Sequence, residues 1–131
     1  LAIAHSQYHV HGAYIVEHSD IAGFSRQQQQ FLAALVRTHR RSIPKAAFDA
    51  LPDRLLMSAR RLAALLRLAV LLHRAHEADP IPQLDVRADG NTLTVCVSRR
   101  WLDARPLVRA DLEGEPEDIT GLGLALKLEF V

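Results

Sequence analysis

The longest helical pattern in the chain reads Arg54-Leu-Leu-Met-Ser-Ala-Arg-Arg-Leu-Ala-Ala-Leu-Leu-Arg-Leu-Ala-Val-Leu-Leu-His-Arg-Ala-His-Glu-Ala78. Its leucines and alanines recur at intervals of three, four and seven residues, which indicates an α-helix. They also cover much of the helix circumference, so we expect the middle of this helix to be largely buried.

Three arginines of this helix, Arg60, Arg67 and Arg74, recur every seven residues and form a stripe along it. We expect Arg60 and Arg74 to face solvent or to pair with acidic groups further along the chain. Arg67 lies in the most apolar part, and a buried guanidinium needs a partner. The sequence therefore predicts a structural ion pair for Arg67 in preference to a ligand contact.

The segments before the long helix are also predicted to be helical. An apolar stretch indicates a helix over residues 10–19. Ser25 followed by Gln28 is the signature of a capping box, and the helix that it starts runs to about residue 38. Pro44 suits the first turn of a helix, which predicts a short one over residues 44–51.

Two prolines, Pro80 and Pro82, end the long helix, and beyond them apolar residues recur at every second position, as in β-strands. Two strands, over 84–89 and 92–97, are joined by the hairpin signal at Gly90. A helical turn, a helix and a third strand follow, over residues 100–104, 106–118 and 122–130. The predicted fold class is α+β, with an all-helical domain over residues 1–79 and a small β-β-α-β domain over residues 80–131.

The composition is that of a soluble globular protein, with 49% hydrophobic and 24% charged residues among 131. The most apolar run, residues 62–72, is too short to span a bilayer, and the start resembles no signal peptide, so no membrane role is indicated. Cys96 is the only cysteine and is expected to be a small buried hydrophobe, consistent with a reducing cytoplasm. A start at Leu1 instead of methionine suggests a piece of a longer protein.

Charge is distributed unevenly along the chain. Residues 1–76 carry ten Arg and Lys against four Asp and Glu, a net charge of +6, whereas residues 77–131 carry six against eleven, a net charge of −5. A basic first half is expected to attract an anionic partner. Aromatic residues are only 5% of the chain, which makes single-stranded nucleic acid an improbable partner because few bases could stack.

Four of the seven histidines lie near the start of the chain, at His5, His9, His11 and His18. Three roles stay open for them: packing at helix ends, contact with phosphate, and ligation of a metal ion. Metal ligation is the weakest of the three, because neither HExxH nor CxxC spacing is present. We therefore assign no metal ligands.

A second cationic group follows the helix that ends near residue 38. Its members could hold phosphate, because arginine forks match phosphate oxygens, or could form a solvated helix end; they are Arg37, His39, Arg40, Arg41 and Lys45. The acidic residues between Asp111 and Asp118 are expected to form a solvated helix face. No nucleophile elbow or phosphate-binding glycine loop is present, so no catalytic residues are assigned.

Five blocks of sequence resemble the C-terminal half of the exopolyphosphatase/guanosine pentaphosphate phosphohydrolase family, and the resemblance covers essentially the whole chain. The blocks are His5-Ser-Gln-Tyr-His-Val-His-Gly-Ala-Tyr-Ile-Val16, His18-Ser-Asp-Ile-Ala-Gly-Phe-Ser-Arg-Gln27, Leu35-Val-Arg-Thr-His-Arg-Arg41, Leu66-Arg-Leu-Ala-Val-Leu-Leu72 and Arg100-Trp-Leu-Asp-Ala-Arg-Pro-Leu107. The resemblance implies that the helical part is an HD-like domain. It also implies that the phosphohydrolase site, with its Mg²⁺, lies in N-terminal actin-like domains absent from this chain.

The same resemblance implies an accessory role. The His-Asp doublet of metal-binding HD enzymes would precede Leu1, and Val70 stands where those relatives have a ligating aspartate. This fragment is therefore expected to be non-catalytic, to bind inorganic polyphosphate and to contribute to a homodimer. The implied contacts are His5, His9, His11, His39, Arg40 and Arg41, with Arg37 and Lys45 behind them. The alternatives are a metal-dependent HD-type nucleotide phosphohydrolase and an RNA- or protein-interaction module.

Overall fold

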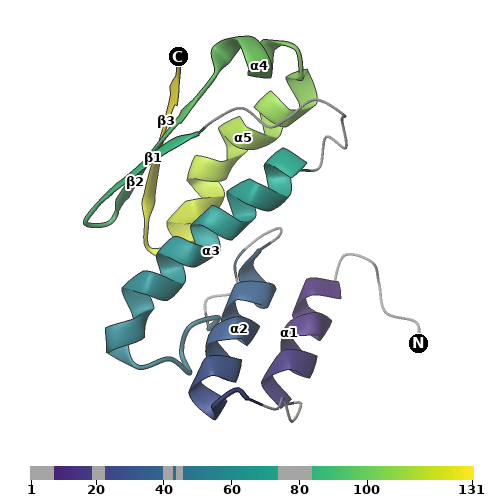
Figure 1. Ribbon diagram of the computed structural model, residues 1–131, viewed down its shortest axis with the longest axis vertical. Coiled ribbons are helices and arrows are strands. Elements are labelled where there is room, and N and C mark those ends of the chain that lie inside the picture. The colour runs from purple at the N-terminus through teal and green to yellow at the C-terminus, as the bar shows by residue number, and fades with distance from the viewer. Residues whose placement is uncertain (1–7, 19–22, 40–42, 44–45, 74–83) are drawn as a thin grey trace.

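The computed structural model describes residues 8–18, 23–39, 43, 46–73 and 84–131, with the backbone alone at residues 8–11 and 18. The helices come first and a small sheet follows, so the predicted α+β class is confirmed. Figure 1 shows the elements in order: α1 (Tyr8–His18), α2 (Arg26–Thr38), α3 (Asp53–His73), β1 (Asp85–Asp89), β2 (Thr92–Val97), α4 (Arg99–Asp103), α5 (Pro106–Ile119), the 3₁₀ turn η2 (Thr120–Leu122) and β3 (Ala125–Phe130).

The first two helices lie side by side and approach closely because small residues face each other (Figure 1). A Cβ atom on Gly12 would stand 3.3 Å from Cγ1 of Val36, and Ala13 and Ala33 are fully buried. Tyr14 and Ile15 belong to the apolar stretch that indicated this helix, yet they are 60% and 50% exposed. Among the described residues α1 packs mainly against α2, so one face of α1 is buried.

The start of α2 is the predicted capping box. The Ser25 hydroxyl accepts a hydrogen bond from the Gln28 backbone N–H at 3.1 Å, and the Ser25 backbone N–H donates to the Gln28 side chain at 2.9 Å. Two of the N–H groups that a helix start leaves unsatisfied are thereby paired.

The short helix predicted over residues 44–51 is wrong for its described part, residues 46–51. These residues form turns, with i→i+3 hydrogen bonds from Asp49 N–H to the Ala46 carbonyl and from Leu51 N–H to the Phe48 carbonyl. Pro52 disfavours helical geometry at the residue before it. Ala47, Phe48 and Leu51 are all buried, so packing against the core holds this segment.

Helix α3 spans Asp53–His73, and the rest of the predicted helix lies outside the described residues. Its buried positions are Ala59, Ala63, Ala64, Arg67, Leu68, Leu71 and Leu72. The expectation that its middle is largely buried is wrong for one side, because Leu62, Leu65 and Leu66 are 37–45% exposed. These three leucines form an exposed stripe at i, i+3 and i+4 along the helix.

The sheet has the order β1-β2-β3, with β1 and β2 antiparallel and β2 and β3 parallel. The predicted hairpin is confirmed, and Gly90 supplies the positive φ of +56° that its tight turn needs. Helices α4 and α5 form the crossover that a parallel pair requires, which completes the predicted β-β-α-β order. Both α3 and α5 lie on one side of the sheet (Figure 1).

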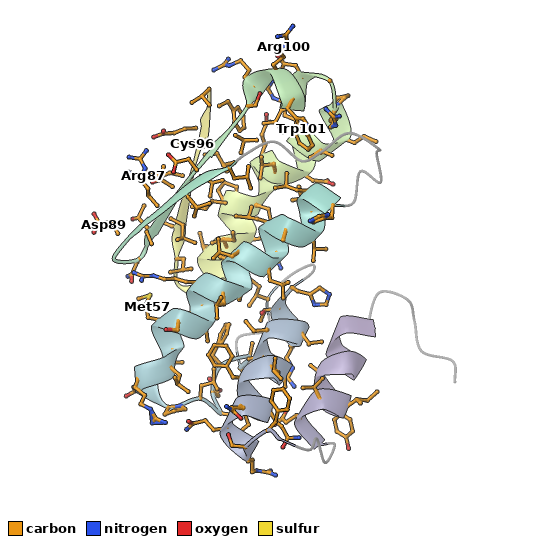
Figure 2. The ribbon with its side chains drawn as sticks, viewed as in Figure 1. Met57, Arg87, Asp89, Cys96, Arg100 and Trp101 are labelled. Carbon is orange, nitrogen blue, oxygen red and sulfur yellow. The ribbon has the colours of Figure 1, made fainter. Side chains whose placement is uncertain are left out.

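Burial in the strands follows their distance from these helices. In β2, Leu93, Val95 and Val97 are buried as the alternation predicts, whereas every residue of the edge strand β1 is exposed. Cys96 is not the buried hydrophobe expected, because it shares β2 with these residues but faces the opposite side. Figure 2 shows Cys96 and Arg87 on this outer face.

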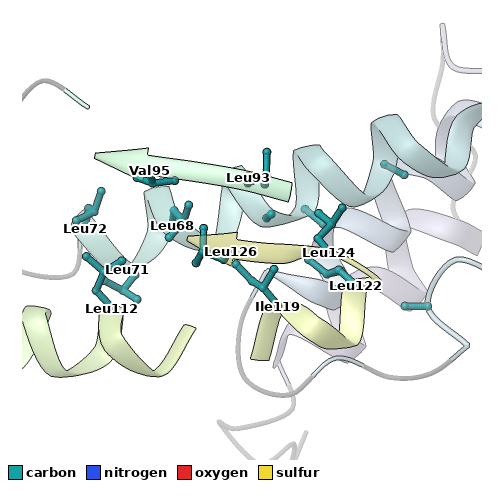
Figure 3. Close-up of a cluster of buried hydrophobic side chains, with 14 of the residues drawn as sticks. Leu68, Leu71, Leu72, Leu93, Val95, Leu112, Ile119, Leu122, Leu124 and Leu126 are labelled. Atoms are coloured by element: carbon teal, nitrogen blue, oxygen red, sulfur yellow. The ribbon is translucent and has the colours of Figure 1, made fainter. Parts of the chain in front are cut away.

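One cluster of buried side chains runs through the described molecule. Figure 3 shows α3 residues such as Leu68 and Leu72 packed with Val95 of β2, Leu112 of α5 and Leu126 of β3. The same cluster includes residues of α2 and of the segment before α3. Side chains from both sides of residues 79 and 80 therefore share one core, and the division of the chain there stays a prediction. Within the described residues, no helix has the length and hydropathy to cross a membrane.

Candidate functional site

The predicted phosphate-binding set lies around α1 and the end of α2, and the structure describes part of it. Arg37 and His39 are described with their side chains, His9 and His11 only by their backbone in α1. The others, His5, Arg40, Arg41 and Lys45, lie outside the described residues. The structure therefore places two of the eight predicted side chains, both at the C-terminal end of α2.

Both of these side chains contact neighbouring protein groups. An Arg37 guanidinium nitrogen lies 3.2 Å from a carboxylate oxygen of Glu17, so this ion pair joins α2 to α1. The Nδ1 atom of His39 lies within hydrogen-bond distance of the Val36 carbonyl. Arg37 is thus partly neutralised by Glu17.

Arg67 is the most completely bonded cation in the described residues. Its Nε and one terminal nitrogen each donate to a different oxygen of Glu115, both at 3.0 Å, and the same terminal nitrogen lies 3.5 Å from Asp118. The other terminal nitrogen donates to the Thr38 carbonyl at 3.0 Å. Arg67 is 4% exposed and Glu115 is 7% exposed, so the pair is buried and bidentate.

This buried pair fixes the end of α2. The Thr38 carbonyl belongs to the last turn of α2, where carbonyl groups lack partners within the helix. Arg67 of α3 satisfies that carbonyl while it binds α5 through Glu115. Arg37 and His39, the first two members of the predicted cationic group, therefore stand at a helix end that two other helices hold in place.

The burial of Glu115 corrects the expectation that the acidic residues of this helix form a solvated face. Asp111, Glu113 and Glu117 are exposed as expected, but Glu115 is not. A signal was present in the sequence, since Glu115 follows Leu112 by three residues and precedes Ile119 by four. That spacing places Glu115 on the apolar face of α5, opposite the one charged residue in the apolar part of α3.

A second polar site, which the sequence did not indicate, lies where the segment before α3 meets η2. Here a pocket of about 480 Å³ is lined by Asp49, Asp53 and Arg60, among other residues. Arg60 was expected to face solvent or to pair with an acidic group, yet it is half-buried and makes no ion pair among the described residues. Sequence patterns miss the site because its walls come from segments about 70 residues apart.

On the outer face of the sheet, Cys96 lies between two charged side chains. Its Sγ atom donates a hydrogen bond to Glu129 at 3.2 Å and lies 4.0 Å from an Arg87 nitrogen. The pKa of the Cys96 thiol is raised above its ordinary value, mainly by the hydrogen bond to Glu129 and to a smaller extent by desolvation. A thiol held in its neutral form is a poor nucleophile.

No group of three or more His, Cys, Asp or Glu side chains that could hold a metal ion occurs among the described residues. The side chains of His5, His9 and His11 are not among the described ones.

With this geometry in hand, comparison with known proteins gives the family. The family model for Ppx/GppA phosphatase, domain III, matches residues 1–116. The chain belongs to the Ppx/GppA phosphatase family. The resemblance seen in its sequence blocks is thereby confirmed, and the Ppx/GppA match includes α1 to α4 and most of α5.

Curated relatives with the name guanosine-5′-triphosphate,3′-diphosphate pyrophosphatase are similar to this Ppx/GppA chain. That of Vibrio campbellii is 34% identical over 121 residues, which is 90% of this chain and 23% of the relative. That of Pseudoalteromonas translucida is 30% identical over 126 residues, 96% of this chain and 25% of the relative. The chain spans about a quarter of the length of these relatives.

Proposed function

We propose that this chain is the C-terminal part of an exopolyphosphatase-type phosphohydrolase, and that it binds polyphosphate without being catalytic alone. The match to domain III of Ppx/GppA phosphatases is the observation that carries this proposal. In this proposal, N-terminal actin-like domains of the longer protein hydrolyse the terminal phosphate and hold the Mg²⁺. The protein is proposed to act in the cytoplasm. Contribution to a homodimer is part of the proposal.

Electrostatics supports the binding role. Residues 1–76 carry a net charge of +6, and a linear polyphosphate carries about one negative charge per internal phosphate. The proposed contacts are His5, His9, His11, His39, Arg40 and Arg41, with Arg37 and Lys45 behind them. Anchoring of the α2 end by Arg67 favours this role, because cations on a fixed support lose less conformational freedom when they bind.

The absence of catalysis by this chain is supported by its sequence at one position. Val70 of α3 stands where metal-binding HD enzymes have an aspartate, and an aliphatic side chain cannot ligate a metal ion. The role left to this part of the protein is to hold the polyanion.

A second candidate concerns the substrate of the whole protein. The relatives of Vibrio and Pseudoalteromonas carry names that specify a guanosine triphosphate diphosphate. That name favours guanosine pentaphosphate as the parent substrate, with the same cationic residues contacting its phosphates.

Titration of the chain with polyphosphate tests the binding role. We expect affinity to fall by at least about tenfold between about 50 mM and 200 mM salt, because phosphate contacts release counterions. Arg40→Ala combined with Arg41→Ala should remove most of this affinity. The matched control is Arg99→Ala combined with Arg100→Ala, an adjacent exposed pair around α4 at the opposite end of the molecule from α1 and α2 (Figures 1 and 2). Binding that is insensitive to salt, or equal effects of the two pairs, would contradict the proposal.

The alternatives make different predictions in the same preparation. One bound divalent ion per chain, together with release of phosphate from nucleotides, would support an HD-type phosphohydrolase. Retention of RNA in the presence of excess polyphosphate would support an interaction module.

A further inference from the structure

Strand β1 is an open edge of the sheet. Among the described residues it pairs with β2 alone, and each of its residues, Asp85–Asp89, is exposed. An open edge presents backbone N–H and C=O groups that can bind another extended strand. Val86, which is 38% exposed, adds an apolar side chain to the middle of this edge.

The bonding of β2 shows which backbone groups of β1 point to the open edge. The carbonyls of Asn91 and Val97 accept hydrogen bonds from the β3 side, from Ala125 at 2.8 Å and Val131 at 3.0 Å. Backbone groups alternate in direction along a strand, so the even-numbered residues of β2 direct theirs toward β1.

The partners of those even-numbered residues are Asp85, Arg87 and Asp89 of β1, so the backbone groups of these three are used within the sheet. The residues between them direct their backbone groups to the open edge, together with the residue that precedes β1; they are Leu84, Val86 and Ala88.

The other edge of the sheet, at β3, is partly covered. Phe130 is next to Val131, whose N–H reaches β2, so the Phe130 carbonyl points away from β2, and it accepts a hydrogen bond from Arg99 at 3.2 Å. The guanidinium carbon of Arg109 lies 5.1 Å from the centre of the Phe130 ring. Side chains beside β3 thus occupy one end of its edge, and β1 has no such cover among the described residues.

The charges of β1 complement a second copy of the same strand. When two copies run antiparallel with Val86 opposite Val86, the outward backbone groups of both strands meet. Asp85 of each copy then lies directly opposite Arg87 of the other, on the outer face of the sheet. These positions are the ones at which facing side chains come closest, and opposite charges there stabilise the pair. The twofold axis through Val86 repeats the ion pair.

Other antiparallel registers are disfavoured. With Arg87 opposite Arg87, like charges meet at the axis, which is destabilising. With Ala88 opposite Ala88, Val86 lies opposite Gly90, whose φ of +56° belongs to the hairpin turn and not to the strand. The register centred on Val86 therefore pairs opposite charges without using the turn.

Helix α3 adds apolar surface beside this edge. Arg61 donates to the Gly90 carbonyl at 2.8 Å, and Leu72 packs with Val95 (Figure 3), so both mark the side of α3 that faces the sheet. Leu65 follows Arg61 by four residues and precedes Leu72 by seven, which places it on that side too, yet it is 38% exposed. Its side chain is available for burial against a chain bound at β1.

We infer that two copies of this chain associate through β1, antiparallel about Val86, so that the three strands of each copy form one continuous sheet. The inference rests on the homodimer of the proposed function, of which it names the interface. The ion pair of Arg87 with Glu129 in its own chain spans 3.9 Å between side chains that are 66% and 53% exposed, so it is weak and leaves Arg87 able to bind the second copy.

Sedimentation equilibrium of the chain, whose monomer has a mass of 14.6 kDa, tests the association. We expect the unmodified chain to dimerise, and Asp85→Arg or Arg87→Asp to weaken the dimer at least about tenfold, because each places like charges opposite each other. An equimolar mixture of the two variants should restore most of the affinity, since each copy then carries the charges that complement the other. Such rescue cannot arise from misfolding. A monomeric unmodified chain, or a mixture that dimerises no better than the variants alone, would overturn the inference.

Asp89→Arg is the matched control. It makes the same charge change as Asp85→Arg and lies on the same outer face of β1 as Arg87 (Figure 2), but outside the paired residues. It should weaken the dimer less than about twofold, and its mixture with Arg87→Asp should recover less association than the first mixture. Equal rescue by Asp89→Arg and Asp85→Arg would overturn the register centred on Val86.

The same measurements separate this inference from the proposed function. A dimer that Asp85→Arg and Arg87→Asp leave intact would retain the homodimer and overturn the β1 interface. A monomeric chain that binds polyphosphate in a salt-sensitive manner would retain the binding role and overturn the interface.

Discussion

The guanidinium of Arg67 joins three helices, because it binds Glu115 and Asp118 of α5 and the last turn of α2 from its place in α3. Arg67→Ala leaves the Glu115 carboxylate buried without its partner. We expect this change to lower the free energy of unfolding by about 3–5 kcal/mol, as measured by urea denaturation.

Two controls accompany the Arg67 measurement. Arg67→Met combined with Glu115→Leu removes both charges and should recover a large part of the loss, the Thr38 carbonyl remaining unpaired. Arg87→Ala breaks an ion pair with Glu129 whose side chains are 66% and 53% exposed, and should cost less than about 1 kcal/mol. Equal effects of Arg67→Ala and Arg87→Ala would contradict a stabilising role for the buried pair.

Cys96 gives a prediction about pH. Because the hydrogen bond to Glu129 raises the pKa of the thiol, the midpoint of its alkylation rate against pH should lie above that of a free cysteine. Glu129→Gln removes the negative charge and weakens this bond, so the midpoint should move to lower pH and alkylation at pH 8 should become faster. Glu113→Gln, at an exposed carboxylate of α5, is the control. An unchanged or higher midpoint in Glu129→Gln would show that Glu129 is not the cause.

At the scale of elements, the structures predicted correctly have local causes. The capping box of Ser25 and Gln28 and the turn at Gly90 depend on residues that are neighbours in the chain. The alternation in β2 depends on the pleat alone. Such features can be read from sequence without knowledge of the packing.

The element predicted wrongly depends on contacts distant in sequence. Residues 46–51 form turns because their apolar side chains pack into the core. The strand predicted over residues 84–89 is present as β1, but its full exposure could not be read from its alternation, because it depends on where the helices cover the sheet. The same reason explains the sites. A partner for Arg67 could be expected, but its identity as Glu115 required knowledge of how α5 packs on α3. The pocket beside Arg60 required the position of η2.

The two sides of α3 should differ in their sensitivity to substitution. Leu68 is 3% exposed and lies in the core, so Leu68→Ala should destabilise by about 2–5 kcal/mol. Leu66→Ala changes a residue on the exposed stripe and should cost less than about 1 kcal/mol, because little area is removed from contact. Thermal and urea unfolding of the two variants provide the measurement. A loss for Leu66→Ala as large as that for Leu68→Ala would show that a contact absent from this structure covers the stripe.

At the scale of the whole molecule, α3 connects the two parts of the chain. Its buried side chains share one cluster with residues of α2 and the segment before α3, and with β2, α5 and β3 (Figure 3). Arg61 of α3 also donates to the Gly90 carbonyl of the hairpin at 2.8 Å. The sequence predicts a domain boundary between residues 79 and 80, whereas the core is continuous across it. The cooperativity of unfolding shows whether the two sides unfold together or as separate domains.

A shared core predicts a single unfolding transition. Trp101 of α4 is the only tryptophan, so its fluorescence reports on the second half, while circular dichroism at 222 nm reports on all helices. We expect the two urea curves to superimpose, as two-state unfolding requires. Leu51→Ala removes a buried side chain in the first half and should shift the Trp101 curve and the helical signal to the same lower midpoint, by about 2–5 kcal/mol of stability. If the Trp101 midpoint stays fixed while part of the helical signal is lost earlier, the two halves unfold independently, and the division between residues 79 and 80 is a thermodynamic boundary.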